Sequence, residues 1–192
     1  LDEVVCEKLK LNGNKNPDLS KWKNFLKNLS EPKQSVEIGL IGKYVELKDS
    51  YISIAESLIH AGAYNKTKIN LHWIHSSKIE DNSSQEILSQ MDGIIVAPGF
   101  GERAVEGKIM AVKYARENKI PFLGICLGMQ CAVVEFARNV LSLNNANSTE
   151  INSNTPHPVI SMMEEQKKLK KMGGTMRLGS YKCNIKTGSL LE

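Results

Sequence analysis

The pattern of hydrophobic and polar positions changes at about residue 35. From there on, short apolar runs typical of strands alternate with stretches of helical periodicity. Strands are predicted at 36–42, 69–75, 93–97 and 120–125. Helices are predicted at 50–62, 84–90, 105–118 and 128–140. Because parallel strands need helical crossovers, this order predicts an α/β fold with a doubly wound, mostly parallel sheet and helices on both faces.

Residues 1–34 differ in composition and are rich in Asn, Lys and turn formers, which is typical of a connector. We therefore expect a connector over 1–34 and a domain over 35–192. Apolar residues within the connector are spaced three and four apart and predict a short helix, capped by Asp18 or Ser20, that docks on a neighbour. They are Trp22, Phe25, Leu26 and Leu29.

Composition narrows the class of protein. The chain has 192 residues, 41% hydrophobic and 24% charged, enough for one globular domain with a substantial core. No stretch approaches the roughly 18 to 20 apolar residues of a membrane helix, and the N-terminus does not resemble a signal peptide, so we expect a cytoplasmic protein. The net charge of +4 is modest and partly local to the Lys-rich run at 166–171, so we expect no nucleic-acid binding.

Four cysteines carry the candidate chemistry, and their spacing predicts free thiols and no metal site. Cys126 lies between Gly124 and Gly128, after a predicted strand and before a predicted helix, in the Gly-x-nucleophile-x-Gly form of a nucleophile elbow. The electropositive helix N-terminus would favour a thiolate, and its amides could stabilise an oxyanion. The alternative is a small residue packed in the core, as we expect for Cys131.

A second strand, loop and helix unit at 92–108 places another glycine-bearing loop at the same sheet edge. Gly99 and Gly101 let the backbone approach a ligand closely, so an amide there could point at an oxygen next to the thiol. The alternative is an ordinary turn between a strand and a helix. Two such loops beside one thiol favour the functional interpretation.

Five segments together resemble the class I glutamine amidotransferase domain of the CTP synthase family, in this order and at compatible spacings. They are "GLIGKYVELKDSYISIAESLIHAG", "APGFGERAVEGK", "PFLGICLGMQCAVVEFARNVL", "NANSTE" and "GGTMRLG". "GICLGMQ" indicates a class I amidotransferase, and "EFARNVL" followed by the last two segments narrows the resemblance to CTP synthases. It extends from about residue 36 to the end, and "LDEVVCEKL" resembles the region that joins a synthetase domain to this one.

The resemblance implies that Cys126 attacks the side-chain amide of L-glutamine and releases ammonia. Gly99 and Leu127 would supply the oxyanion amides, and Glu150 would receive the α-amino group of the substrate. The elbow would continue around the substrate through Gly128, Met129 and Gln130. Ammonia would then reach a synthetase domain that binds UTP and ATP and forms CTP, in a homo-oligomer, by resemblance a tetramer. ATP, Mg and the activator GTP are implied for the full-length protein, and no cofactor for this chain.

Departures from the family pattern limit the resemblance. Pro98 precedes Gly99 where two glycines are common, and proline has no amide hydrogen, so only Gly99 and later residues of the loop can donate. Ala104 replaces a common glycine, which we expect a helix start to tolerate. Phe100 and the segment at 170–179 are candidates for holding GTP.

The His-x-Glu pair that the family places near its C-terminus does not occur in the chain. We expect no catalytic role for His60, His72 or His75, and an exposed turn at His157. The simplest hypothesis is therefore a C-terminally incomplete domain, inactive alone. The alternatives are another class I amidotransferase subunit, such as one serving GMP or carbamoyl phosphate synthesis, and a degenerate, non-catalytic binding module.

Overall fold

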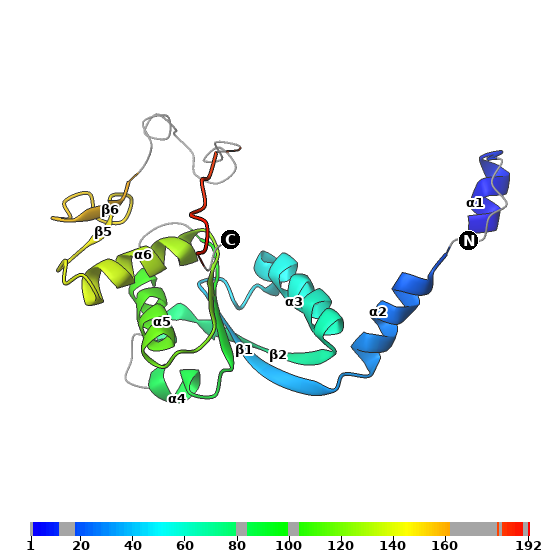
Figure 1. Ribbon diagram of the computed structural model, residues 1–192, viewed down its shortest axis with the longest axis horizontal. Coiled ribbons are helices and arrows are strands. Elements are labelled where there is room, and N and C mark those ends of the chain that lie inside the picture. Colours follow the sequence, from blue (N-terminus) through cyan, green and yellow to red (C-terminus); the bar gives the residue numbers. More distant parts are fainter. Residues whose placement is uncertain are drawn as a thin grey trace.

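A four-stranded parallel sheet forms the centre of the molecule, with strand order β2-β1-β3-β4 (Figure 1). The computed structural model describes residues 2–11, 18–79, 84–99, 104–161, 180, 182–189 and 192. The strands are β1 (Gln34–Gly42), β2 (Thr67–His75), β3 (Gly93–Val96) and β4 (Phe122–Gly124). The predicted parallel α/β sheet is confirmed, and the predicted strand at 120–125 is shorter than expected.

Helices cover both faces of this sheet. One face packs against the short helix η1 (Lys48–Tyr51) and α3 (Ile52–Asn65). The other packs against α4 (Ser84–Leu88), α5 (Val105–Glu117) and α6 (Leu127–Asn139), with η2 (Ser76–Ile79) following β2. Each of the four predicted helices is present, with ends that differ by at most three residues.

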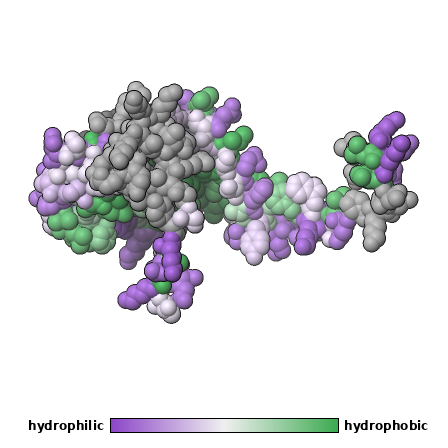
Figure 2. All heavy atoms as spheres, turned by 90° about the horizontal axis from the view of Figure 1, so that it is seen from above, coloured by the Kyte–Doolittle hydropathy of each residue, from purple (hydrophilic) through white to green (hydrophobic). Residues whose placement is uncertain are grey.

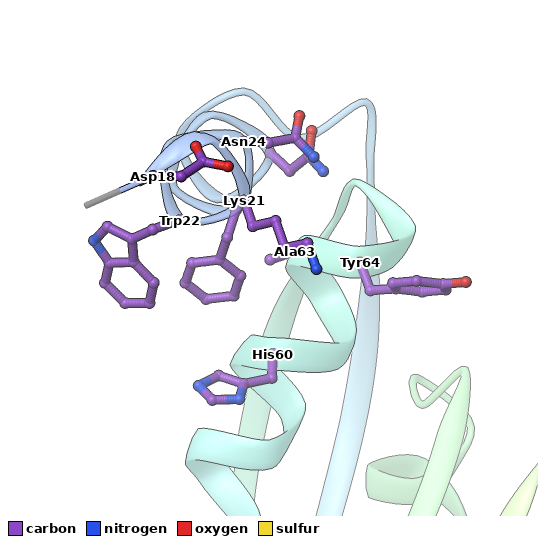
Figure 3. A pocket seen from close by; sticks show the side chains of 9 residues that line it. Asp18, Lys21, Trp22, Asn24, His60, Ala63 and Tyr64 are labelled. Carbon is purple, nitrogen blue, oxygen red and sulfur yellow. The ribbon is translucent and has the colours of Figure 1, made fainter. Parts of the chain in front are cut away.

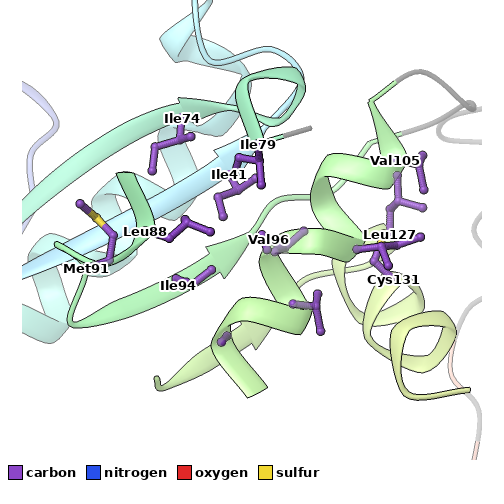
Figure 4. Close-up of a cluster of buried hydrophobic side chains, with 14 of the residues drawn as sticks. Ile41, Ile74, Ile79, Leu88, Met91, Ile94, Val96, Val105, Leu127 and Cys131 are labelled. Carbon is purple, nitrogen blue, oxygen red and sulfur yellow. The ribbon is translucent and has the colours of Figure 1, made fainter. Parts of the chain in front are cut away.

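Side chains of the central strands pack alternately into two separate cores, because successive residues of a strand point to opposite faces of the sheet. Leu40 and Ile95 pack on the α3 face, with Tyr51. Ile41 and Val96 pack on the opposite face, where Figure 4 shows them with side chains of the flanking helices. Strand β3 is buried at every position, as expected for a central strand covered on both sides.

The parallel arrangement brings the loops after β1, β3 and β4 to one edge of the sheet. Ile41 pairs with Val96, and Val96 pairs with Gly124, so the three strands end at nearly the same level. The segments that leave this edge include the loop at 97–99 and the turn at Cys126. The predicted juxtaposition of the two glycine-bearing loops therefore follows from the strand register.

Two helices precede the sheet, α1 (Asp2–Lys8) and α2 (Ser20–Ser30). Figure 2 shows this part of the chain projecting from the body of the molecule. The predicted helix in the connector is confirmed as α2. The predicted cap by Asp18 or Ser20 is wrong: the N-cap residue is Leu19, without a side-chain capping hydrogen bond, and the Asp18 carboxylate instead accepts a hydrogen bond from the Ser20 amide at 2.9 Å. Helix α2 packs against α3, where the Phe25 ring meets His60 edge-on at 5.4 Å between centroids. Helix α1 was not predicted, and the boundary after residue 34 stays a prediction.

A small second sheet packs against α6 and consists of β5 (Asn147–Ser148) and β6 (Pro158–Ile160). The expectation of an exposed turn at His157 is wrong: the residue is half-buried, and its carbonyl accepts a hydrogen bond from the Asn147 amide at 3.1 Å. Within the described ranges, no helix is long and apolar enough to cross a membrane.

Candidate active site

Cys126 occupies a strained turn between β4 and α6. Its backbone has φ 55° and ψ −110°, on the side of the conformational map that residues with a side chain rarely adopt, and its thiol is exposed. Strain of this kind costs on the order of 1 to 3 kcal/mol and concentrates at functional sites. The geometry agrees with the predicted elbow and excludes core packing for Cys126. Cys131 takes the core position instead, with 1% of its surface exposed.

The two glycines around the cysteine are required by close packing. A Cβ on Gly124 would lie 2.6 Å from the carbonyl carbon of Gly128, and a Cβ on Gly128 would overlap the carbonyl oxygen of Val96. The same Val96 oxygen accepts a hydrogen bond from the Ile125 amide at 3.0 Å. These contacts hold the start of α6 against β3 and raise Cys126 above the sheet edge.

The amides of the elbow are not equivalent. The Met129 and Gln130 amides donate to the Cys126 carbonyl at 3.1 and 3.2 Å, and the Gly128 amide donates to Ile125 at 2.9 Å. The Leu127 amide has no acceptor among the residues that the structure describes. Of the four predicted elbow residues, Leu127 is therefore the one whose amide is available to an oxyanion, while the substrate contacts expected of the other three stay predictions.

The loop at 97–99 lies directly beside this elbow. A Cβ built on Gly99 would be 3.8 Å from a methyl carbon of Leu127, so the structure brings together these two predicted oxyanion residues. Like the Leu127 amide, the Gly99 amide has no acceptor within the described part of the chain. Phe100 and Gly101, and the segment at 170–179 suggested for GTP, lie outside the described residues.

Two residues that the sequence analysis missed hold this loop from opposite sides. The buried Lys108 Nζ donates to the Ala97 carbonyl at 2.8 Å and to the Pro98 carbonyl at 3.5 Å. The Tyr51 hydroxyl donates to the same Pro98 carbonyl at 3.5 Å. Lys108 lies in the apolar stripe of α5, three residues after Val105, and a lysine in that stripe was the signal that could have revealed it.

The expectation that Ala104 is well tolerated as an ordinary helix start is wrong. Ala104 is the N-cap residue of α5 and adopts the left-handed conformation, with φ 62° and ψ 24°. An L-residue with a Cβ is disfavoured there, whereas glycine is not. The left-handed conformation therefore explains why glycine is common at this position in the family. Alanine adopts the same conformation here at an energetic cost.

Glu150 lies just after β5, half-buried, on the sheet that packs against α6. Arg138 anchors this segment: its Nε donates to the Ala146 carbonyl at 2.6 Å, and its Nη1 pairs with Glu106 on α5 at 2.8 Å. The Glu150 carboxylate makes no hydrogen bond or ion pair with any described residue. Its predicted contact with the substrate α-amino group stays a prediction.

None of the four histidines, all of which the structure describes, lies in β4 or α6, the two elements that flank Cys126. His75 ends strand β2, which two strands separate from β4, so with a strand spacing of about 4.8 Å the two are roughly 14 Å apart across the sheet. His75 Nδ1 is within 2.6 Å of the Ser77 hydroxyl, and His72 pairs with Glu37. Among the described residues, no histidine side chain is hydrogen-bonded to the Cys126 thiol.

A groove of about 590 Å³ between α2 and α3 lies apart from this site (Figure 3). Trp22, Phe25 and His60 are among its lining residues, and neither Cys126 nor Gly99 contributes to it. Among the described residues, no group of three or more His, Cys, Asp or Glu side chains could hold a metal ion. The candidate chemistry at the sheet edge is that of an exposed thiol with the Leu127 and Gly99 amides beside it.

Comparison with known proteins agrees with this site. Residues 46–191 match the family described as glutamine amidotransferase class-I. The CTP synthase of Flavobacterium johnsoniae is 57% identical over 99% of this chain, and that of Cytophaga hutchinsonii is 59% identical over 98%. In both cases the chain spans only 35% of the relative's length.

A solved structure agrees in fold as well as in sequence. The Trypanosoma brucei CTPS glutaminase domain with bound acivicin matches with a TM-score of 0.64 and 36% identity, over 67% of this chain and 50% of that one. The resemblance drawn from the five motifs is thus confirmed. This chain belongs to the class I glutamine amidotransferase family.

Proposed function

We propose that this chain is the glutamine-hydrolysing part of a CTP synthase, and that Cys126 is its nucleophile. The observation that carries the proposal is the exposed thiol at φ 55°, at the N-terminus of α6 and beside the Gly99 loop. The similarity to CTP synthases over nearly the whole chain supports the choice of product. The other class I amidotransferases remain the alternative.

The proposed reaction is hydrolysis of an amide through a thioester. The Cys126 sulfur attacks the side-chain carbonyl carbon of glutamine, and the Leu127 and Gly99 amides donate to the oxygen that becomes negative. The carbon–nitrogen bond breaks, and the nitrogen leaves as ammonia with the proton that the thiol gave up. Water then attacks the thioester, so that glutamate and the free thiol are regenerated.

This reaction requires a group that moves protons between the thiol, the leaving nitrogen and water. Since the 192 residues contain no His-x-Glu pair, and no described histidine is hydrogen-bonded to Cys126, we assign this task to another part of the full-length protein. A degenerate binding module is the less favoured alternative, because the chain keeps a strained conformation at Cys126 that a binding surface would not need.

In the full-length protein, ammonia would aminate UTP at a separate synthetase domain that binds ATP and Mg²⁺. GTP activation, a tetrameric assembly and a cytoplasmic location complete the proposal.

The test is to compare two nitrogen sources in the full-length protein. Cys126→Ala should abolish CTP formation from glutamine and leave CTP formation from added ammonia largely intact, because the thiol only releases ammonia. Loss of both activities in a folded protein would contradict the division into two sites. Ammonia use that requires XMP or bicarbonate instead of UTP would favour the other amidotransferases.

A further inference from the structure

Lys108 is a buried lysine whose Nζ hydrogen-bonds to two carbonyls of the loop beside Cys126. Its residue surface is 2% exposed, and its side chain enters the space between α5 and the sheet. Burial lowers its pKa. A buried amine is costly unless it is hydrogen-bonded, and a methionine of similar length would fill an apolar core at lower cost. The amine must therefore serve a purpose other than core packing.

The hydrogen bonds of Lys108 fix the orientation of a peptide group that matters for catalysis. The Pro98 carbonyl and the Gly99 amide belong to the same planar peptide unit, which is trans. In a trans peptide unit the N–H and C=O bonds point in opposite directions. Because Lys108 and Tyr51 both hold the Pro98 oxygen, the Gly99 N–H is directed away from them.

Pro98 increases the importance of this orientation. The proline has no N–H, so Gly99 supplies the first free amide after strand β3. The shorter bond, from Lys108 to the Ala97 carbonyl at 2.8 Å, fixes the preceding peptide as well. A neutral amine has two N–H donors and an ammonium has three, so either protonation state can hold both carbonyls.

We propose that Lys108 is a positioning residue, which aims the Gly99 amide at the oxygen that becomes negative when Cys126 attacks the substrate. This inference rests on the proposed function. Removing an oxyanion donor outright costs about 10²- to 10³-fold in kcat, and a misdirected donor should cost less. Since the contact strengthens in the transition state, the loss should appear in kcat and leave KM nearly unchanged.

The experiment compares Lys108→Met with Lys113→Met, an exposed position on the same helix, in the full-length protein. Lys108→Met should lower kcat for glutamine hydrolysis roughly 10- to 100-fold with KM within about two-fold, while its thermal unfolding midpoint stays the same or rises. Lys113→Met should match the wild type. Lys108→Gln keeps an N–H donor and should give an intermediate kcat, which covers the case in which the methionine variant does not fold.

A second measurement separates positioning of the amide from an effect on the thiol itself. Alkylation of Cys126 by iodoacetamide passes through no oxyanion, so its rate, followed on the Cys126 peptide by mass spectrometry, should stay within about two-fold of wild type in Lys108→Met. An unchanged kcat, or a fall in kcat matched by a fall in the alkylation rate, would overturn the positioning role of Lys108 but not the proposed function. Absence of glutamine hydrolysis in the wild type would overturn the proposed function and this inference with it.

Discussion

Gly128 at the start of α6 packs directly on the carbonyl group of Val96 in β3. A Cβ on Gly128 would lie 2.9 Å from the Val96 carbonyl carbon and 3.1 Å from its Cβ. The turn that carries Cys126 and the strand that leads to Gly99 thus support each other through one backbone contact. The geometry of the site depends on the absence of a side chain at Gly128.

Gly128→Ala should lower the free energy of unfolding by about 3 kcal/mol, because the added methyl group overlaps backbone atoms that cannot rotate away. Urea unfolding of the two proteins measures the difference. Val133→Ala, at a 38% exposed position of the same helix, should change the value by no more than about 0.5 kcal/mol. Equal stabilities for Gly128→Ala and the wild type would show that α6 can move off β3 freely.

Ala104→Gly should raise the free energy of unfolding by about 1 kcal/mol, because glycine adopts the left-handed conformation of this N-cap without the penalty of a Cβ. The same substitution at Ala111, which is buried within α5, should have the opposite sign. Thermal unfolding of both variants provides the comparison. A destabilised Ala104→Gly would mean that the left-handed conformation is not what the folded protein uses.

The free energy of unfolding should fall in alkaline solution because of the buried Cys131 thiol. Burial raises the pKa of this thiol from the ordinary 9.0 to about 11. Below pH 9 the thiol is protonated in both states, whereas between pH 9 and 11 it ionises in the unfolded chain first, so rising pH favours unfolding. Across that window, the wild type should lose on the order of 2 kcal/mol more than Cys131→Ala. A matching loss in the two proteins would refute the raised pKa, and the exposed Cys183→Ala serves as the control.

Much of the fold could be predicted because its signals are local. The apolar runs and helical periods predicted the β1–β4 strands and their helices, and the Gly-x-Cys-x-Gly spacing predicted the turn at Cys126. Ala104 was misjudged because its φ depends on how the loop enters α5, which no local pattern records. Tyr51 was missed for a similar reason, since its importance comes from the Pro98 carbonyl, 47 residues along the chain. Lys108 did have a local signal, a lysine in the apolar stripe of α5, which the sequence analysis did not use.

The substrate side of the site was harder to predict than its backbone. Glu150 was selected through the "NANSTE" resemblance alone, since a carboxylate in a polar stretch has no distinguishing pattern. The structure adds that Arg138 holds this stretch to α6 and α5. Sequence spacing could not show that contact, because it depends on the main-chain carbonyl of Ala146.

Glu150→Ala should weaken glutamine binding by roughly 1.5 to 3 kcal/mol, the contribution of a charge-assisted hydrogen bond to the α-ammonium group. The variant should show a higher KM for glutamine and keep CTP formation from ammonia. Glu117→Gln, at an exposed position at the end of α5, should leave both unchanged. A wild-type KM in Glu150→Ala would remove this residue from the substrate site.

The central claim is that Cys126 is the nucleophile, and covalent labelling of the full-length protein tests it most directly. A chloroketone analogue of glutamine should modify Cys126 ahead of Cys6, Cys131 and Cys183, because only Cys126 combines an exposed thiol with the strained turn beside two free amides. Excess glutamine should protect it. Peptide mass spectrometry that finds the modification on Cys126, and suppressed by glutamine, is the predicted result. Modification mainly of another cysteine, or labelling of Cys126 that glutamine does not slow, would contradict the account.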